Sequence, residues 1–190
     1  TRGKVEPMLE ELKQQVYAAN MELPRRGLVT YTWGNVSGID RKAGLVVIKP
    51  SGVAYEELTP DKLVVLDLDG RKVEGGLNPS SDTKTHLELY KAYPQLGGIV
   101  HTHSTYATAW AATGQNIPCG LTMMGDEFGG PVPVGPFRLI GSEAIGEGVV
   151  ETLKKYPKSP AVLMQNHGPF TIGKDAESAV KAAAMTEEVA

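Results

Sequence analysis

Apolar residues between positions 8 and 23 recur at helical spacing and form one stripe. Acidic residues stand in what would be the first turn, where the helix dipole favours them. The pattern predicts an amphipathic helix over residues 8–23 that ends at Pro24. Residues 1–7 lack this pattern, and we expect them to be a leader or a cloning remnant.

A second helix is expected over residues 78–94, because Ser80 or Ser81 can cap its start, Asp82 suits its first turn, and Pro94 bounds its end. Further helices are expected over residues 106–113, 142–156 and 176–190.

Short runs rich in apolar and β-branched residues alternate with these helices. They cover residues 27–40, 44–52, 62–70, 97–104 and 161–168, and most close on a glycine-containing turn. Strands that interleave with helices along the whole chain indicate a layered α/β fold. The length of 190 residues fits a single domain over residues 1–190.

Charge and composition exclude several kinds of partner. The net charge is -3 and basic residues are scattered, so the stripe that binds nucleic-acid phosphates is lacking and no nucleic acid is expected. No run of 18 apolar residues occurs, which argues against a membrane partner. The single cysteine, Cys119, cannot close an internal disulfide, so we expect a reducing, cytoplasmic location.

Two of the four histidines, His101 and His103, stand one residue apart behind an apolar run. In an extended strand both side chains project to the same face, with Cβ atoms about 6.6 to 6.8 Å apart, and can converge on one metal ion. His167 follows another apolar run and is the candidate third ligand. The alternative is that His101 and His103 lie on a polar face of the strand, where neighbouring groups form hydrogen bonds to their ring nitrogens. His86 is interpreted as an ordinary helix residue.

Asp82 and Asp126 are the carboxylates best placed for acid/base chemistry. The alternative for Asp82 is a first-turn acid that only complements the helix dipole. The alternative for Asp126 is a solvated acid in a glycine-rich loop. The turns at residues 49–52 and 78–81 present hydroxyl and N–H groups that suit an anion, although plain turn chemistry also explains them. Neither turn has the spacing of a nucleotide-binding loop.

Taken together, these segments resemble the class II aldolase family. The similar blocks are "LPRRGLVTYTWGNVSGID", "VIKPSGV", "NPSSDTKTHLELYKAYPQLGGIVHTHSTYATAWA" and "NHGPFTIGKDAESAV". The resemblance implies a layered sandwich with a central, largely antiparallel β-sheet covered by helices on both faces.

The resemblance also implies a divalent metal, Zn²⁺ or else Mn²⁺ or Co²⁺. Its ligands would be His101, His103 and His167, with Asp82 beside or on the metal. The implied substrate is a sugar phosphate, and its phosphate would be contacted by Gly34, Asn35, Ser51, Gly52, Ser80 and Ser81. Asp126 would be the catalytic acid/base.

The sequence "SSD", where aldolases of the family have "SSE", favours the epimerase members. These convert L-ribulose 5-phosphate to D-xylulose 5-phosphate by reversible cleavage of the C3–C4 bond. The nearest alternative is an aldolase that cleaves a sugar 1-phosphate such as L-fuculose 1-phosphate. The other is a non-catalytic interaction domain similar to the adducin head. The resemblance does not distinguish an enzyme of arabinose breakdown from one of ascorbate breakdown.

The resemblance further implies a homotetramer with its sites at subunit interfaces. It also implies a catalytic tyrosine near the C-terminus, supplied by the neighbouring subunit. No tyrosine follows Tyr156 in this sequence. We therefore expect the sequence to lack the C-terminal tail of the native protein.

Overall fold

A computed structural model describes residues 2–140 and 142–190, with side chains from residue 9 onward. Its centre is one eight-stranded sheet with the strand order β4-β3-β2-β1-β5-β8-β7-β6. All neighbouring strands are antiparallel except β6 and β7, which are parallel. The strands are β1 (Asn35–Asp40), β2 (Leu45–Ile48), β3 (Val64–Asp67), β4 (Lys72–Glu74), β5 (Gly98–His101), β6 (Val134–Gly135), β7 (Ala161–Met164) and β8 (Gly168–Gly173).

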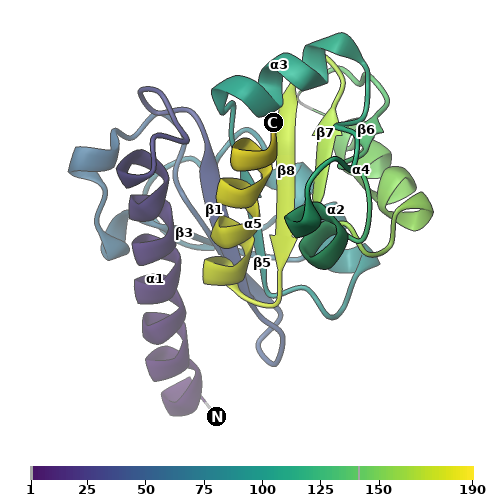
Figure 1. Cartoon of the computed structure of the whole chain (residues 1–190). Coiled ribbons are helices and arrows are strands. Elements are labelled where there is room, and N and C mark those ends of the chain that lie inside the picture. The colour runs from purple at the N-terminus through teal and green to yellow at the C-terminus, as the bar shows by residue number, and fades with distance from the viewer. Residues whose placement is uncertain (1, 141) are drawn as a thin grey trace.

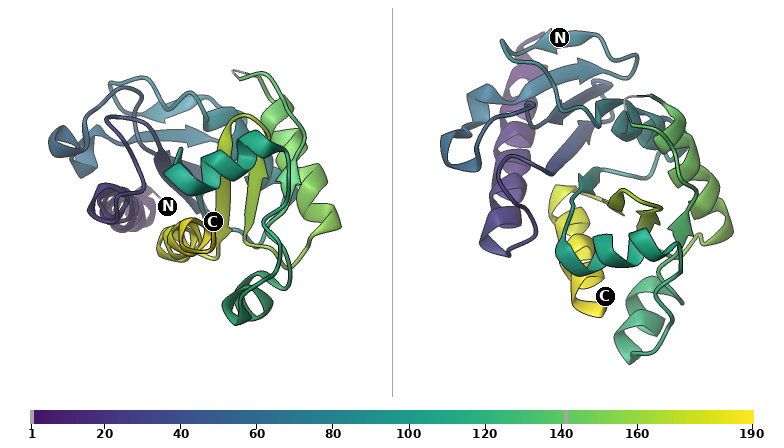
Figure 2. Two further views of the ribbon diagram at one scale, coloured as in Figure 1. Left: turned by 45° about the horizontal axis from the view of Figure 1, so that its top comes forward. Right: turned by 90° about the horizontal axis from the view of Figure 1, so that it is seen from above.

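Helices cover both faces of this sheet (Figures 1 and 2). One face carries α1 (Arg2–Arg25), α3 (Thr105–Thr113) and α5 (Ala176–Val189). The other carries α2 (Thr83–Ala92) and α4 (Ala144–Lys155), which pack against each other. Short helical turns are η1 (Tyr55–Glu57), η2 (Pro60–Lys62) and η3 (Met124–Phe128). The expected layered sandwich with a largely antiparallel sheet is confirmed.

Alternation along β1 and β5 decides which side chains face which helices. Val36 and Val100 belong to the core beneath α1 and α5, whereas Ile99 belongs to the core beneath α2 and α4. Asn35 pairs with His101 in the ladder, one strand position beyond the Val36 and Val100 pair. Because side chains alternate, Asn35 and His101 open on the α2 face at the end of their strands.

Glycines at the start of β5 and the end of β8 let α5 approach the sheet closely. A Cβ atom at Gly98 would lie 2.3 Å from the Asp175 carbonyl oxygen, and one at Gly173 would lie 2.5 Å from the Ala179 nitrogen. Such separations are far below van der Waals contact, so only glycine fits. Both glycines therefore serve helix packing.

The first helix does not end at Pro24, contrary to the sequence-based prediction. It begins at Arg2, within the segment that the apolar pattern leaves out, and continues to Arg25. It ends because Gly27 adopts φ 67° and Leu28 N–H donates to the Leu23 carbonyl, the usual glycine-terminated helix end. Proline is tolerated in this last turn, where the lost N–H costs one hydrogen bond.

Several strands also differ from the expectation. Residues 27–34 are irregular, and the strand is instead the polar-looking segment Asn35–Asp40, which is buried between β2 and β5. The strand β5 ends at His101, so His103 lies beyond it. The short edge strands β4 and β6 and the strand β8 were not predicted, because brief or glycine-bounded runs carry little period-2 signal.

Candidate metal centre

The three histidines proposed as ligands meet at one end of the sheet. His101 is the last residue of β5, and His103 stands two residues further, just before α3. His167 lies in the tight turn between β7 and β8. A Cβ at Gly168 would lie 2.7 Å from the Thr102 carbonyl oxygen, so this glycine permits the turn to approach the segment that carries His103.

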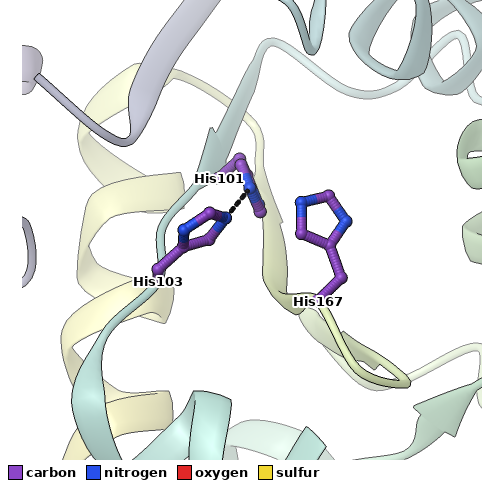
Figure 3. Close-up of side chains that lie close together, drawn as sticks. All are labelled: His101, His103 and His167. Carbon is purple, nitrogen blue, oxygen red and sulfur yellow. Dashed lines mark hydrogen bonds between the residues drawn. The ribbon is translucent and has the colours of Figure 1, made fainter. Parts of the chain in front are cut away.

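Their ring nitrogens converge (Figure 3). One nitrogen from each histidine lies within 4.8 Å of the others, and the Nε2 atoms of His101 and His103 are 3.0 Å apart. His101 Nδ1 lies 2.9 Å from the Pro169 carbonyl oxygen, which can only accept, so Nδ1 carries the proton and Nε2 keeps its lone pair. A backbone carbonyl in this role is the usual outer partner of a metal-binding histidine.

The protonation of the cluster suits a cation. Burial lowers the pKa of His101 to about 3, and the nearby Asp82 carboxylate offsets this only in part. Burial also lowers the pKa of His103 and of His167, again opposed by Asp82. All three imidazoles are therefore neutral at pH 7, which is the form that binds metal. Three neutral nitrogens beside a carboxylate fit a divalent ion of the zinc type.

Asp82 lies beside the triad and is held by two side chains. Its Oδ2 accepts from Asn35 Nδ2 at 2.8 Å and from Ser80 Oγ at 3.4 Å. Asp82 occupies the N-cap position of α2, but its carboxylate accepts no hydrogen bond from the helix backbone. Burial opposes its ionisation, but His101, His86 and the Asn35 amide outweigh burial and lower its pKa. The carboxylate is thus charged and is held by Asn35 and Ser80 instead of by the helix backbone.

The two serine turns lie side by side next to Asp82. Pro50 and Pro79 form an isolated bridge, and Ser51 N–H donates to the Asn78 carbonyl at 2.9 Å. Asn35 Nδ2 also donates to Ser80 Oγ at 2.9 Å. The structure therefore brings together the residues predicted to contact phosphate, which are Gly34, Asn35, Ser51, Gly52, Ser80 and Ser81.

Asp126 is not joined to the triad within this chain. It is exposed in η3, which packs through Met124 and Phe128 into the core beside α3. Its neighbour Glu127 pairs with Lys181 of α5 at 3.3 Å. Among the hydrogen bonds and ion pairs of the described residues, none connects Asp126 to a histidine or to Asp82.

His86 is not the ordinary helix residue that the sequence indicates. It is fully buried, its Nδ1 lies 2.6 Å from Ser37 Oγ, and Ser37 Oγ lies 2.9 Å from Tyr90 Oη. Burial lowers the pKa of His86 to about 4, opposed in part by Asp82. This network fixes α2 against β1, and the polar-looking sequence around Ser37 carried no sign of it.

Lys49 is the second residue that sequence reasoning missed. It is 1% exposed, and its Nζ donates to the Val53 carbonyl at 2.7 Å and lies 4.8 Å from the Tyr55 ring centre. Burial lowers the pKa of Lys49 to about 8. The side chain stabilises the turn that carries Ser51 and places a positive charge behind it. The sequence signal was a lysine directly after a fully apolar strand.

Comparison with known proteins identifies the family. Residues 14–190 match the family described as Class II Aldolase and Adducin N-terminal domain. The chain belongs to this family. It is 54% identical to L-ribulose-5-phosphate 4-epimerase UlaF of Salmonella paratyphi C (strain RKS4594), over 96% of this chain and 83% of that protein.

Solved structures agree with the family assignment. The chain is similar to an L-fuculose 1-phosphate aldolase with a TM-score of 0.82 and 28% identity, over 94% of this chain and 84% of that one. It is equally similar to YgbL of Klebsiella pneumoniae, a putative aldolase/epimerase/decarboxylase, with a TM-score of 0.83 and 28% identity, over 95% and 87% of the two chains. Within the described residues, no helix has the length and apolar character needed to cross a membrane.

Proposed function

We propose that this chain is a metal-dependent epimerase that interconverts L-ribulose 5-phosphate and D-xylulose 5-phosphate. The observation that carries the proposal is the convergence of three imidazole nitrogens beside the Asp82 carboxylate. This centre occurs in a chain that is 54% identical to a protein named as that epimerase. The "SSD" sequence at residues 80–82 supports the same choice.

We assign the metal ligands to His101, His103 and His167, with Asp82 as the carboxylate beside or on the ion. Zn²⁺ suits this donor set, and Mn²⁺ or Co²⁺ can replace it. His167 Nδ1 is buried and accepts or donates no hydrogen bond among the described residues, whereas its other nitrogen faces His101 and His103 (Figure 3). When bound, the ion supplies the positive charge that stabilises oxygens of the substrate as they become negative.

The reaction conserves all atoms. The C4 hydroxyl loses its proton, and C4 with its oxygen becomes an aldehyde group. The electrons of the C3–C4 bond remain on the three-carbon fragment. The aldehyde fragment, glycolaldehyde phosphate, rotates so that the opposite face of its carbonyl group meets C3. C3 then attacks C4 again. The new C4 oxygen takes up a proton, so the only change is inversion at C4.

The proposed roles rest on the positions of the side chains and on the resemblance to the family. The two serine turns, with Lys49 behind them, hold the phosphate end of the substrate. We assign proton exchange at the C4 oxygen on one face to Asp126. Because Asp126 is exposed and separate from the triad of its own chain, it would serve the site of a neighbouring subunit in a homotetramer. The group on the opposite face would also come from a neighbouring subunit.

The unpaired cysteine supports a cytoplasmic location for this reaction, because Cys119 is exposed and a reducing environment keeps it free. Similarity to an L-fuculose 1-phosphate aldolase makes a sugar 1-phosphate aldolase the second candidate function.

One experiment separates the candidates. The full-length native protein, loaded with Zn²⁺, is incubated with L-ribulose 5-phosphate, and the products are resolved by ³¹P NMR. We expect D-xylulose 5-phosphate without accumulation of glycolaldehyde phosphate. Accumulation of glycolaldehyde phosphate would favour the aldolase. Absence of both products, together with absence of bound metal by elemental analysis, would favour a non-catalytic interaction domain.

A further inference from the structure

An exposed aromatic pair lies beside the three-histidine centre. The Trp33 ring centre is 6.5 Å from that of His103, and the Tyr31 ring meets Trp33 edge-on at 5.9 Å. Trp33 is 55% exposed and Tyr31 is 83% exposed. Large aromatic side chains are usually much more buried in a folded chain. The exposure of this pair therefore calls for a contact that the described residues do not supply.

The backbone around Trp33 is fixed, which separates this segment from an ordinary mobile loop. The Tyr55 hydroxyl donates to the Gly34 carbonyl at 3.0 Å, and the Trp33 carbonyl oxygen lies 3.3 Å from the same hydroxyl oxygen. Trp33 N–H donates to the Thr30 carbonyl at 3.2 Å. Tyr31 has φ 53°, a left-handed conformation that non-glycine residues rarely adopt and that often marks functional segments. The backbone that carries the indole is thus held in place by the fold.

The same segment connects the metal centre to the serine turns. The ring of Trp33 lies next to His103, and the chain continues through Gly34 to Asn35, whose amide contacts Ser80. A substrate with its ketose oxygens at the histidines and its phosphate at the serine turns would extend past Trp33. In L-ribulose 5-phosphate the middle of that span is C4, the carbon whose configuration changes.

We propose that Trp33 is a specificity-determining residue that retains the aldehyde fragment while it turns. This inference rests on the proposed function. An epimerase must keep glycolaldehyde phosphate in the site after C3–C4 cleavage, whereas an aldolase releases it. An indole on this fixed backbone offers an apolar surface that blocks escape of the fragment. The face of its ring forms no hydrogen bond to the carbonyl group of the rotating fragment. Loss of the indole opens a path to solvent. In a fraction of turnovers the aldehyde fragment then escapes, and the reaction ends as cleavage.

The test measures leakage in Trp33→Ala. The ³¹P NMR signal of free glycolaldehyde phosphate is compared with that of D-xylulose 5-phosphate for wild type, Trp33→Ala and Phe137→Ala. Phe137 is the matched control because it is 50% exposed, close to the value for Trp33, and has no ring contact with the histidines among the described residues. We expect the ratio of free aldehyde to epimer to rise about tenfold in Trp33→Ala only.

A spectroscopic readout checks the placement of the indole without turnover. The chain has two tryptophans, Trp33 and Trp110. Co²⁺ added to the metal-free protein should quench the fluorescence of Trp110→Phe strongly and that of Trp33→Phe weakly. Circular dichroism and Co²⁺ affinity check that each variant folds and binds metal. Trp33→Phe keeps an aromatic ring at this position, so it should release less glycolaldehyde phosphate than Trp33→Ala.

Three outcomes overturn the proposal. The first is an unchanged aldehyde ratio in Trp33→Ala while the wild type epimerises. The second is an equal rise in Phe137→Ala. The third is a change of oligomeric state in Trp33→Ala by sedimentation, which would assign the aromatic pair to a contact between copies of the chain. A full-length native wild type that produces no epimer instead overturns the proposed function, so the two failures are distinguishable.

Discussion

The side-chain amide of Asn35 joins the Asp82 carboxylate to the Ser80 hydroxyl. Its Nδ2 lies 2.8 Å from Asp82 Oδ2 and 2.9 Å from Ser80 Oγ. One buried amide on β1 therefore orients both the carboxylate beside the three histidines and a turn proposed to bind phosphate. The two ends of the candidate site are coupled through this residue.

Replacement of Asn35 should weaken both ends of the site. In Asn35→Ala the Asp82 carboxylate loses its shortest hydrogen bond, and we expect Zn²⁺ affinity to fall about 10- to 100-fold, as for other outer-sphere partners of metal ligands. Competition with a chromogenic chelator measures the affinity. Asn116→Ala is the control, because Asn116 accepts from Val134 N–H away from the histidines and should affect stability alone. Equal loss of Zn²⁺ affinity in both variants would contradict the assigned role.

The histidines should differ in what they contribute to folding. His103 is the most exposed of the three histidines, so His103→Asn should lower metal affinity and leave the thermal unfolding of the metal-free protein nearly unchanged. His101 is 1% exposed and stacks on Phe170 with ring centres 4.1 Å apart. His101→Asn should therefore lower metal affinity and also destabilise the metal-free protein by about 1 to 3 kcal/mol. Unfolding of His103→Asn at room temperature would instead indicate a packing role for that histidine.

Buried His86 should make stability depend on pH. Its pKa is about 4 in the folded chain and 6.5 in the reference state, so the unfolded chain binds more protons below pH 6.5. The contribution of neutral His86 to the free energy of unfolding is complete above pH 6.5 and is lost as the pH falls toward 4. A shift of this size corresponds to about 3 kcal/mol. Urea unfolding of wild type and His86→Gln between pH 4 and pH 7.5 should show a flatter pH dependence in the variant, and parallel curves would disprove the assignment.

Gly98 should be intolerant of any side chain. A Cβ atom there would lie 2.3 Å from the Asp175 carbonyl oxygen, and this backbone cannot move without displacing α5 from β5. Gly98→Ala should therefore lower the free energy of unfolding by about 2 kcal/mol or more. Gly76→Ala is the control, since no atom lies within 4 Å of its added Cβ. Denaturant unfolding measures both, and equal stabilities would show that α5 yields easily.

Local pattern was enough to predict most of the helices, the layered fold and the three histidines. Helical spacing near residues 8–23 and apolar runs before His101 and His167 are set by neighbouring residues, so they can be read without the fold. The resemblance to a family then implied the antiparallel sheet and the Asp82 partner.

Tertiary structure decided what those residues do. The polar segment Asn35–Asp40 became a buried strand because it pairs on both sides, and this pairing placed Asn35 beside Asp82. Burial of α2 against β1 changed His86 from a helix residue into a neutral part of a network with Ser37. Asp126, which sequence alone groups with the site, makes no hydrogen bond or ion pair with the histidines among the described residues. These outcomes depend on contacts between residues far apart in sequence, and no local period encodes such contacts.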